Sequence, residues 1–355
     1  MTRVLGEQGR CSRQAALFRR LGRLLAVGLA AVSAGLMAAA AQDAPRSDLR
    51  AVVLYDLGGK FDKSFNEAAY NGAMRFQEET GIRFRDFEPT SETQYEQALK
   101  RFARRKFDVI VAVGVGYAVA ARNVARDYPE SQFTVIDAVV DLPNVRSVTF
   151  KEHEGSFLVG VLAAMATETN KVGFIGGMDI PLIQRFAGGY RQGVDWTKDN
   201  VDYVEGYVGT TPSAWSDPIR AAELAKGQYG RGVDVIFHAA GPSGLGVLQA
   251  AKDEGKLAIG VDSNQNFVAP GHVLTSMVKR VDRAVYEAME DTRHGRWEPG
   301  HEVLGLAEKG VGYVVDEHNR ALITDAMEAR VEEAREKIIA GDIVVKDVEG
   351  GNTGH

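Results

Sequence analysis

The chain of 355 residues is 45% hydrophobic and 25% charged, carries a formal net charge of -6 and contains one cysteine. A single thiol excludes a disulfide framework and any metal site built from several cysteines. The acidic balance makes nucleic acid a poor partner, because phosphate binding requires a surplus of Lys and Arg. The length is enough for two lobes of ordinary domain size.

The first 41 residues differ in composition from the rest. They contain six arginines and one glutamate, and the uncharged apolar run 24–40 ends close to Gln42. A basic start, an apolar run and a small-residue cleavage site are typical of a secretory signal peptide. A membrane-spanning anchor is the alternative, because the run is close to the lower length limit for one. We expect a signal peptide over 1–41, cleaved to leave a chain of net charge -11 with no cysteine for lipid anchoring.

Short apolar runs alternate with amphipathic stretches from residue 49 onward, which is typical of βαβ units and a parallel sheet. In the first part of this region the pattern predicts strands at 51–55, 83–87, 107–113, 132–136 and 145–150, and helices at 64–80, 91–102 and 117–126.

The same pattern restarts near residue 156. It predicts helices at 156–167, 181–197, 218–226 and 243–254, and strands at 171–175, 203–208, 233–237 and 257–261. Two consecutive sets of about five strands indicate an α/β protein with two doubly wound lobes.

The last part of the chain is expected to pass back between the lobes through more than one hinge strand. It is predicted to form a strand at 273–278, a helix at 282–292, an extended stretch at 311–315 and a helix at 319–339. We therefore assign 48–150 with about 263–295 to the N-terminal lobe, 151–262 with about 296–340 to the C-terminal lobe, and 341–355 to a flexible tail.

Sequence motifs of catalysis are absent. The seven histidines show neither the HxH nor the HExxH spacing of metal sites, and no Gly-x-Ser-x-Gly or phosphate-binding Gly-x-x-x-x-Gly-Lys motif occurs. We therefore expect a protein that binds a ligand without converting it, and that needs no metal or cofactor.

The stretch 56–72 carries the clearest binding signal, because it follows the apolar run 51–55. Two glycines permit a tight turn, and Asp62 or Ser64 can then cap a helix, with Ser64 and Glu67 at capping-box spacing. In open α/β sheets, ligands bind where strands end and helices begin. The residues that arrive together at this edge are Asp56, Phe65 and Asn66.

Three carboxylates, Asp56, Asp137 and Asp262, come at the ends of predicted strands. Each alone could be a helix cap or turn residue. Three at equivalent topological positions favour a ligand rich in hydrogen-bond donors, such as sugar hydroxyls or an exocyclic amine.

One candidate aromatic residue comes from each lobe. Phe65 and Trp215 could clamp a planar ring by stacking, although a Phe at a helix start is also a common core residue. Lys279, at the end of the strand 273–278, could donate to a hydroxyl or be a solvated charge.

Motifs in the same order as in a known family extend over nearly all of 49–340. The sequence Asp-Leu-Gly-Gly-x-x-Asp-x-Ser-Phe-Asn at the start of 56–72 resembles the signature of the basic membrane protein (BMP) family. The members of that family are substrate-binding components of ABC importers, among them purine-nucleoside-binding lipoproteins. Further matches are 135–137, 154–160, 172–177, 215–218 and 259–263.

The resemblance implies a type I periplasmic-binding-protein fold whose two lobes close on a nucleoside, such as adenosine, inosine or guanosine. Phe65 and Trp215 would then sandwich the base, and Asp137 would accept hydrogen bonds from its edge. The ribose and the rest of the pocket would be held by Asp262, Lys279, Asp56, Asn66 and the backbone at Gly241. Two features depart from the family: its second stacking residue is more usually Phe, and many relatives carry a lipid-anchoring cysteine.

The resemblance also implies delivery of the ligand to an ABC transporter permease in the inner membrane. We expect a freely diffusing, monomeric periplasmic protein that binds no nucleic acid. A sugar is the alternative ligand, since aromatics and carboxylates also suit pyranose rings. A ligand sensor that presents its closed form to a receptor is the alternative role.

Overall fold

The computed structural model describes residues 45–347, and residues 47–347 belong to one compact unit. The expected signal peptide, 1–41, lies outside the described residues. Within 45–347 no helix combines the length and the hydropathy that crossing a bilayer requires.

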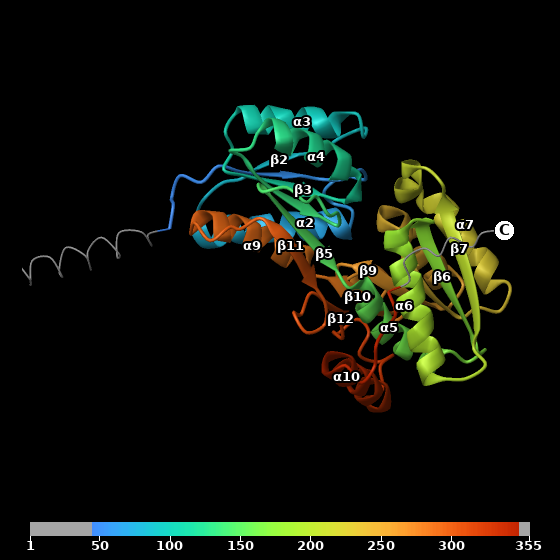
Figure 1. The fold of residues 1–355 in the computed structure, drawn as a ribbon. Helices are drawn as coiled ribbons and strands as arrows, with labels where there is room; N and C mark the ends of the chain where they lie inside the picture. Colours follow the sequence, from blue (N-terminus) through green and yellow to red (C-terminus); the bar gives the residue numbers. More distant parts are fainter. Residues whose placement is uncertain (1–44, 348–355) are drawn as a thin grey trace, which may run out of the picture. The chain divides into compact units, whose positions relative to one another are not determined.

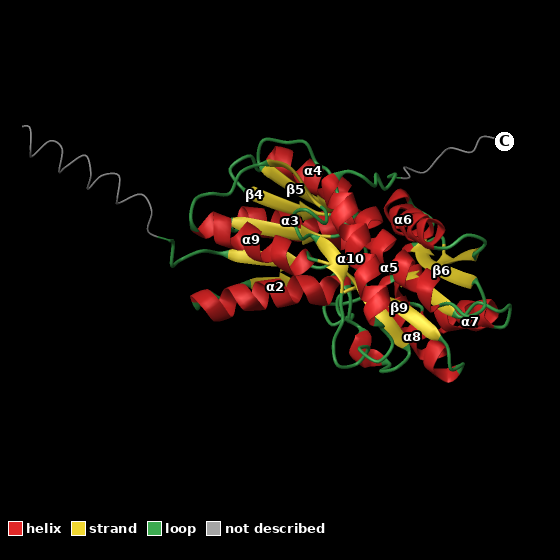
Figure 2. Ribbon diagram, turned by 90° about the horizontal axis from the view of Figure 1, so that it is seen from below, coloured by secondary structure: helices red, strands yellow, loops and turns green. Residues whose placement is uncertain are grey.

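The first lobe is built on a six-stranded sheet in which every pair of neighbouring strands is parallel. Its order is β11 (Gly300–Leu304), β5 (Val145–Phe150), β4 (Gln132–Ile136), β3 (Val109–Val113), β1 (Ala51–Leu54) and β2 (Arg85–Phe87). Helices α3 (Gln94–Arg104) and α4 (Ala118–Asp127) lie on one side of it, and α2 (Phe65–Thr80) and α9 (Val281–Arg293) on the other (Figures 1 and 2).

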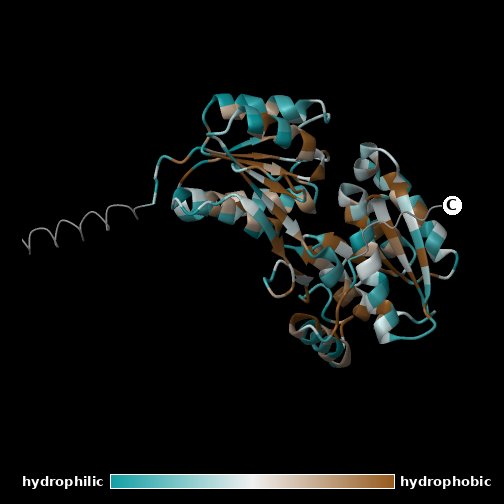
Figure 3. Cartoon of the chain, viewed as in Figure 1, coloured by the Kyte–Doolittle hydropathy of each residue, from teal (hydrophilic) through white to brown (hydrophobic). Residues whose placement is uncertain are grey.

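Alternate residues of the strands explain these two layers. Val52 and Leu54 of β1 belong to the apolar cluster with α3 and α4, whereas Val53 belongs to the cluster with α2 and α9. Successive strand side chains point to opposite faces, so a strand that is apolar throughout can bury both faces. Figure 3 shows this hydrophobic character along the strands.

The second lobe has its own six-stranded sheet, parallel except for one antiparallel edge strand. Its order is β12 (Val311–Tyr313), β10 (Val273–Lys279), β9 (Leu257–Asp262), β8 (Val235–Ala239), β6 (Lys171–Met178) and β7 (Asp202–Gly209). The helices that cover it are α5 (Glu152–Ala166), α6 (Pro181–Thr197), α7 (Pro218–Tyr229), α8 (Gly244–Asp253) and α10 (Asp325–Ala340).

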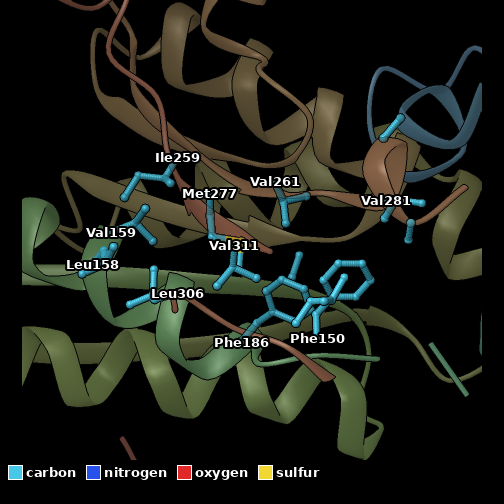
Figure 4. Close-up of a cluster of buried hydrophobic side chains, with 14 of the residues drawn as sticks. Phe150, Leu158, Val159, Phe186, Ile259, Val261, Met277, Val281, Leu306 and Val311 are labelled. Carbon is cyan, nitrogen blue, oxygen red and sulfur yellow. The ribbon is translucent and has the colours of Figure 1, made fainter. Parts of the chain in front are cut away.

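Three segments connect the two sheets, at about 150–152, 279–281 and 304–311, which confirms the expectation of more than one hinge strand. Their backbones are bonded to one another: Lys151 N donates to Leu304 O (3.1 Å), and Arg280 N donates to Gly310 O (2.8 Å). A hydrophobic cluster from β5, α5, α6, β9, β10 and β12 packs around these segments (Figure 4).

The strand pairing corrects the expected allocation of the last part of the chain. Residues 263–295 were assigned to the N-terminal lobe, which is correct for α9, but β10 pairs with β9 in the second sheet. Residues 296–340 were assigned to the C-terminal lobe, which is correct for β12 and α10, but β11, which was not predicted, pairs with β5 in the first sheet. The edge strand β11 is largely exposed and shows little apolar patterning, so nothing in its sequence indicates a strand.

Two further boundaries differ from expectation. Helix α10 begins at Asp325 rather than 319, because Thr324 caps it by accepting from Met327 N (3.2 Å). Residues 341–347 are not a free tail, because Lys346 exchanges two hydrogen bonds with Gln192 of α6 (2.8 and 3.0 Å). The remainder of the expected flexible tail, 348–355, lies outside the described residues.

Glycines allow close packing of α5 on α6, and this leads to a stability prediction. A Cβ added to Gly193 would lie 2.0 Å from Phe157 O, whereas one added to Gly227 in α7 meets no atom within 4 Å. Gly193→Ala should therefore destabilise the protein by about 1–3 kcal/mol, through overpacking. Gly227→Ala, the matched control, should stabilise it by about 0.5–1 kcal/mol, because alanine favours the helix. Urea unfolding measures both, and shifts of the same sign would contradict the packing argument.

Candidate ligand-binding site

Strand ends of both sheets line a cavity that is partly open to solvent. All eight residues predicted from the sequence line this cavity: Asp56, Phe65, Asn66, Asp137, Trp215, Gly241, Asp262 and Lys279. The structure therefore brings the whole predicted set together, and the roles of these residues toward a ligand stay predictions.

Asp137 and Asp262 end their strands in the same unusual backbone conformation. Asp137 directly follows β4 and has φ 66°, and Asp262, the last residue of β9, has φ 63°. Residues other than glycine seldom adopt positive φ, although Asp and Asn do so more readily. Asp137 Oδ2 accepts from Lys279 Nζ (2.6 Å), while its Oδ1 is buried and has no partner among the described residues. This free oxygen is an acceptor that a ligand could satisfy.

Lys279 is buried, with 2% of its surface exposed, so the alternative of a solvated charge is wrong. Its Nζ lies 2.6 Å from Asp137 Oδ2 and 3.0 Å from Glu152 Oε1, and 5.2 Å from the centre of the Phe65 ring. Burial alone would lower the pKa of Lys279, but the surrounding carboxylates, including Asp262, raise it overall. The ammonium is therefore charged and held at the wall of the cavity.

The turn after β1 is held by hydrogen bonds to other groups of the protein. Asn66 accepts from Asp56 N (3.0 Å) and donates to Asp56 O (3.2 Å) and Gly59 O (3.1 Å). The Asp56 carboxylate accepts from Leu57 N (2.8 Å) and from the hydroxyl of Tyr95. Asn66 thus uses both donors of its amide on the turn, which leaves only acceptor capacity for a ligand.

The cap of α2 is Asp62, one of the two residues predicted for this role. Its carboxylate accepts from the backbone N–H of Ser64, Asn66 and Glu67 (2.8–3.0 Å). The expected capping box between Ser64 and Glu67 is wrong, because Asp62 already satisfies these donors and Glu67 accepts from Lys63 N (3.0 Å).

The hydroxyl of Ser64 makes no capping hydrogen bond and connects the two lobes instead. Ser64 Oγ donates to Asp262 Oδ2 (2.7 Å), and Ser263 Oγ donates to Ser64 O (2.7 Å). Gln265 Nε2 also donates to Lys63 O (3.0 Å). The start of α2 is therefore bonded to the loop that follows β9, next to the cavity.

The two candidate stacking residues are half-buried at the cavity. Phe65 is the first residue of α2, and Trp215 lies in a short 3₁₀ helix (Pro212–Ser216). The indole ring packs directly on Gly177, where an added Cβ would lie 2.2 Å from Trp215 Cζ3. Gly177 lies within strand β6 and not in a turn. It is the absence of a side chain there that leaves room for the indole.

Several lining residues were not predicted from the sequence. Most are apolar or carry no reactive group: Leu57, Gly114, Val115, Leu182, Ile183, Phe186, Ala239, Pro242 and Val261. The start of α6 follows a strand end, so the same topological rule could have indicated its first turns. Glu152, which lies behind the lining and contacts Lys279, was missed because α5 begins four residues before the predicted start, 156.

The raised pKa values of two buried carboxyl groups predict how the stability of the protein depends on pH. Burial is the main cause that raises the pKa of Glu152 and of Asp62 to about 7, from ordinary values near 4.5 and 3.8. Such groups bind protons more tightly in the folded state, so their stabilising contribution is complete below pH about 4 and is lost as the pH rises through about 7. The melting temperature of the ligand-free protein should fall between pH 5 and pH 8. Glu152→Gln should show a smaller fall, and an unchanged profile would contradict this assignment.

Two parallel-sheet α/β lobes with a cavity at the strand ends of both define a solute-binding protein of the type I periplasmic-binding fold. The structure resembles a solute-binding protein of an ABC transporter system from Aeropyrum pernix K1, with a TM-score of 0.77 and 31% sequence identity over 84% of this chain and 94% of that one. The expected fold class is therefore confirmed.

The sequence matches the model of the Bmp family, described as ABC transporter substrate-binding protein PnrA-like, over residues 49–349. It is 32% identical to the CD4+ T-cell-stimulating antigen of Listeria innocua, over 86% of this chain and 90% of that protein. It is 30% identical to the ABC transporter nucleoside-binding protein BmpA of Lactococcus lactis subsp. cremoris, over 84% and 90%. The chain belongs to the Bmp family of ABC transporter substrate-binding proteins, which confirms the resemblance found in its motifs.

Proposed function

We propose that this substrate-binding protein captures a purine nucleoside between its lobes and delivers it to an ABC transporter permease. One observation carries the proposal: the cavity combines an aromatic residue from each lobe, Phe65 and Trp215, with the buried, unpartnered oxygen of Asp137. Flat rings bind between aromatic side chains, and a carboxylate accepts from the N–H groups of a base. The nucleoside-binding relative from Lactococcus lactis supports the same ligand class.

The charge of the cavity restricts the ligand further. Its lining contains four carboxyl groups and one ammonium, Asp56, Asp62, Asp137, Asp262 and Lys279. A neutral ligand with several donors satisfies these acceptors, whereas a phosphate would meet like charges in a poorly hydrated space. Nucleosides should therefore bind and nucleotides should be rejected.

A thermal-shift screen tests both statements. Adenosine, inosine or guanosine should raise the melting temperature, since a ligand at 100 times its Kd stabilises the folded state by about 2.7 kcal/mol. Free ribose, galactose and adenosine monophosphate should leave it unchanged. Stabilisation by the sugars without stabilisation by nucleosides would replace this proposal by a sugar-binding function. Equal stabilisation by adenosine and its monophosphate would contradict the charge argument.

The proposed partner, an ABC transporter permease, determines where the protein acts. The binding component of an ABC importer works outside the cytoplasmic membrane, and cleavage of 1–41 would release the protein into the periplasm as a monomer. Mass spectrometry of the exported protein should find an N-terminus at Gln42, with no attached lipid. A retained leader in a membrane fraction would support the membrane-anchor alternative instead.

A further inference from the structure

Glu152 is a buried carboxylate that the proposed binding step does not use. It is the first residue of α5, directly after the first crossing between the lobes, and its side chain has no exposed surface. Neither of its oxygens receives a well-directed hydrogen bond from the part of the chain that the structure describes. Burial of such a group is costly unless a charge lies close by.

That charge is the ammonium of Lys279. Its Nζ lies 3.0 Å from Glu152 Oε1, but it directs its hydrogen bond to Asp137 Oδ2 at 2.6 Å. Arg185 is farther from Glu152, at 3.9 Å, and pairs with Asp347 (3.1 Å). Lys279 therefore has two carboxylate partners, and only Asp137 of the two lines the cavity.

We propose that Glu152 is a positioning residue of the binding site: it is the second partner to which Lys279 turns when a ligand engages Asp137. A ligand that donates a hydrogen bond to Asp137 takes up part of its negative charge and weakens its hold on the ammonium. Glu152 is already at salt-bridge distance, so Lys279 gains a directed hydrogen bond by a small rotation of its terminal atoms. The ammonium then stays paired and keeps a donor for a ligand hydroxyl. This inference rests on the proposed function.

If Lys279 can pair with either Asp137 or Glu152, the stability of the ligand-free protein should depend on the two carboxylates together. Asp137→Asn, Glu152→Gln and the double variant are unfolded in urea at pH 8.5. Each single variant leaves Lys279 one of its two nearest carboxylates, so each should shift the midpoint little, whereas the double variant should shift it by more than the sum. The control is Glu152→Gln combined with Glu96→Gln, which should be additive because Glu96 pairs with Lys100 on the surface of α3 and shares no partner with Glu152. Additive shifts for Asp137 and Glu152 would overturn the proposal.

Calorimetric titration of adenosine, inosine and guanosine measures the effect on binding. Glu152→Gln should bind the nucleoside about tenfold more weakly or worse at an unchanged urea midpoint, because the bound state loses a charge-assisted hydrogen bond. Glu96→Gln, the surface control, should bind normally. Equal affinities of Glu152→Gln and the natural protein would overturn the positioning role. If no nucleoside binds the natural protein, the proposed ligand is wrong, and the unfolding measurements still decide whether Glu152 and Asp137 exchange Lys279.

Discussion

Replacing Lys279 by methionine should destabilise the protein by about 3–5 kcal/mol, and by more at pH 8 than at pH 5. The reason is that Asp137 and Glu152, at 2.6 and 3.0 Å from its Nζ, would remain buried without their positive partner. Removing one member of a buried ion pair costs about this much, because the other charge is left uncompensated. At pH 5 Glu152 binds a proton, which removes part of that cost, since burial raises its pKa to about 7.

Urea unfolding at the two pH values measures the effect, with Lys100→Met as the matched control. Lys100 pairs with Glu96 at 2.6 Å, as close as the buried pair, but on the surface of α3. Surface pairs contribute less than about 1 kcal/mol, so the control should change little at either pH. Similar losses for both variants, or a larger loss for Lys279→Met at pH 5, would contradict the account of the buried network.

The parts of the fold that were predicted correctly are those with a strong local pattern. Strands β4 and β5 and helix α6 have the predicted bounds, because each is a continuous apolar or amphipathic run with clear ends. The site residues were found by a topological rule, that ligands bind where parallel strands end, together with the family pattern. The rule needs no knowledge of side-chain contacts.

The parts that could not be predicted depend on contacts between distant residues. Ser64 and Asp262 are 198 positions apart, and only the folded chain shows that one donates to the other. Glu152 is a polar residue near a predicted helix start, and its buried contact with Lys279, at the end of strand β10, is visible only in the folded chain. The assignment of β10 to the second lobe and of β11 to the first also depends on strand pairing. The sequence of a short, exposed edge strand such as β11 does not indicate its partner.

Gly177→Ala should weaken nucleoside binding about tenfold or more without unfolding the protein. A Cβ at this position would lie between 2.2 and 2.9 Å from three atoms of the Trp215 ring, so the ring must move away from β6. The cavity is the open space that the ring already borders, and displacement into it narrows the slot for a base. Stacking of a base on an aromatic side chain is worth about 1–3 kcal/mol, which corresponds to about 5- to 150-fold in Kd.

The variants that separate this mechanism from general damage are Gly206→Ala and Gly177→Ala combined with Trp215→Phe. An added Cβ at Gly206, on the neighbouring strand β7, comes no closer than 3.6 Å to another group. The affinity of Gly206→Ala for the nucleoside should therefore be unchanged. Phenylalanine is smaller than tryptophan, and the double variant should recover affinity relative to Gly177→Ala alone. Titration of the nucleoside into each variant measures Kd. Failure of Trp215→Phe to restore binding would show that Gly177 does not act through the ring, and the role of Trp215 as the second stacking residue would then have to be abandoned.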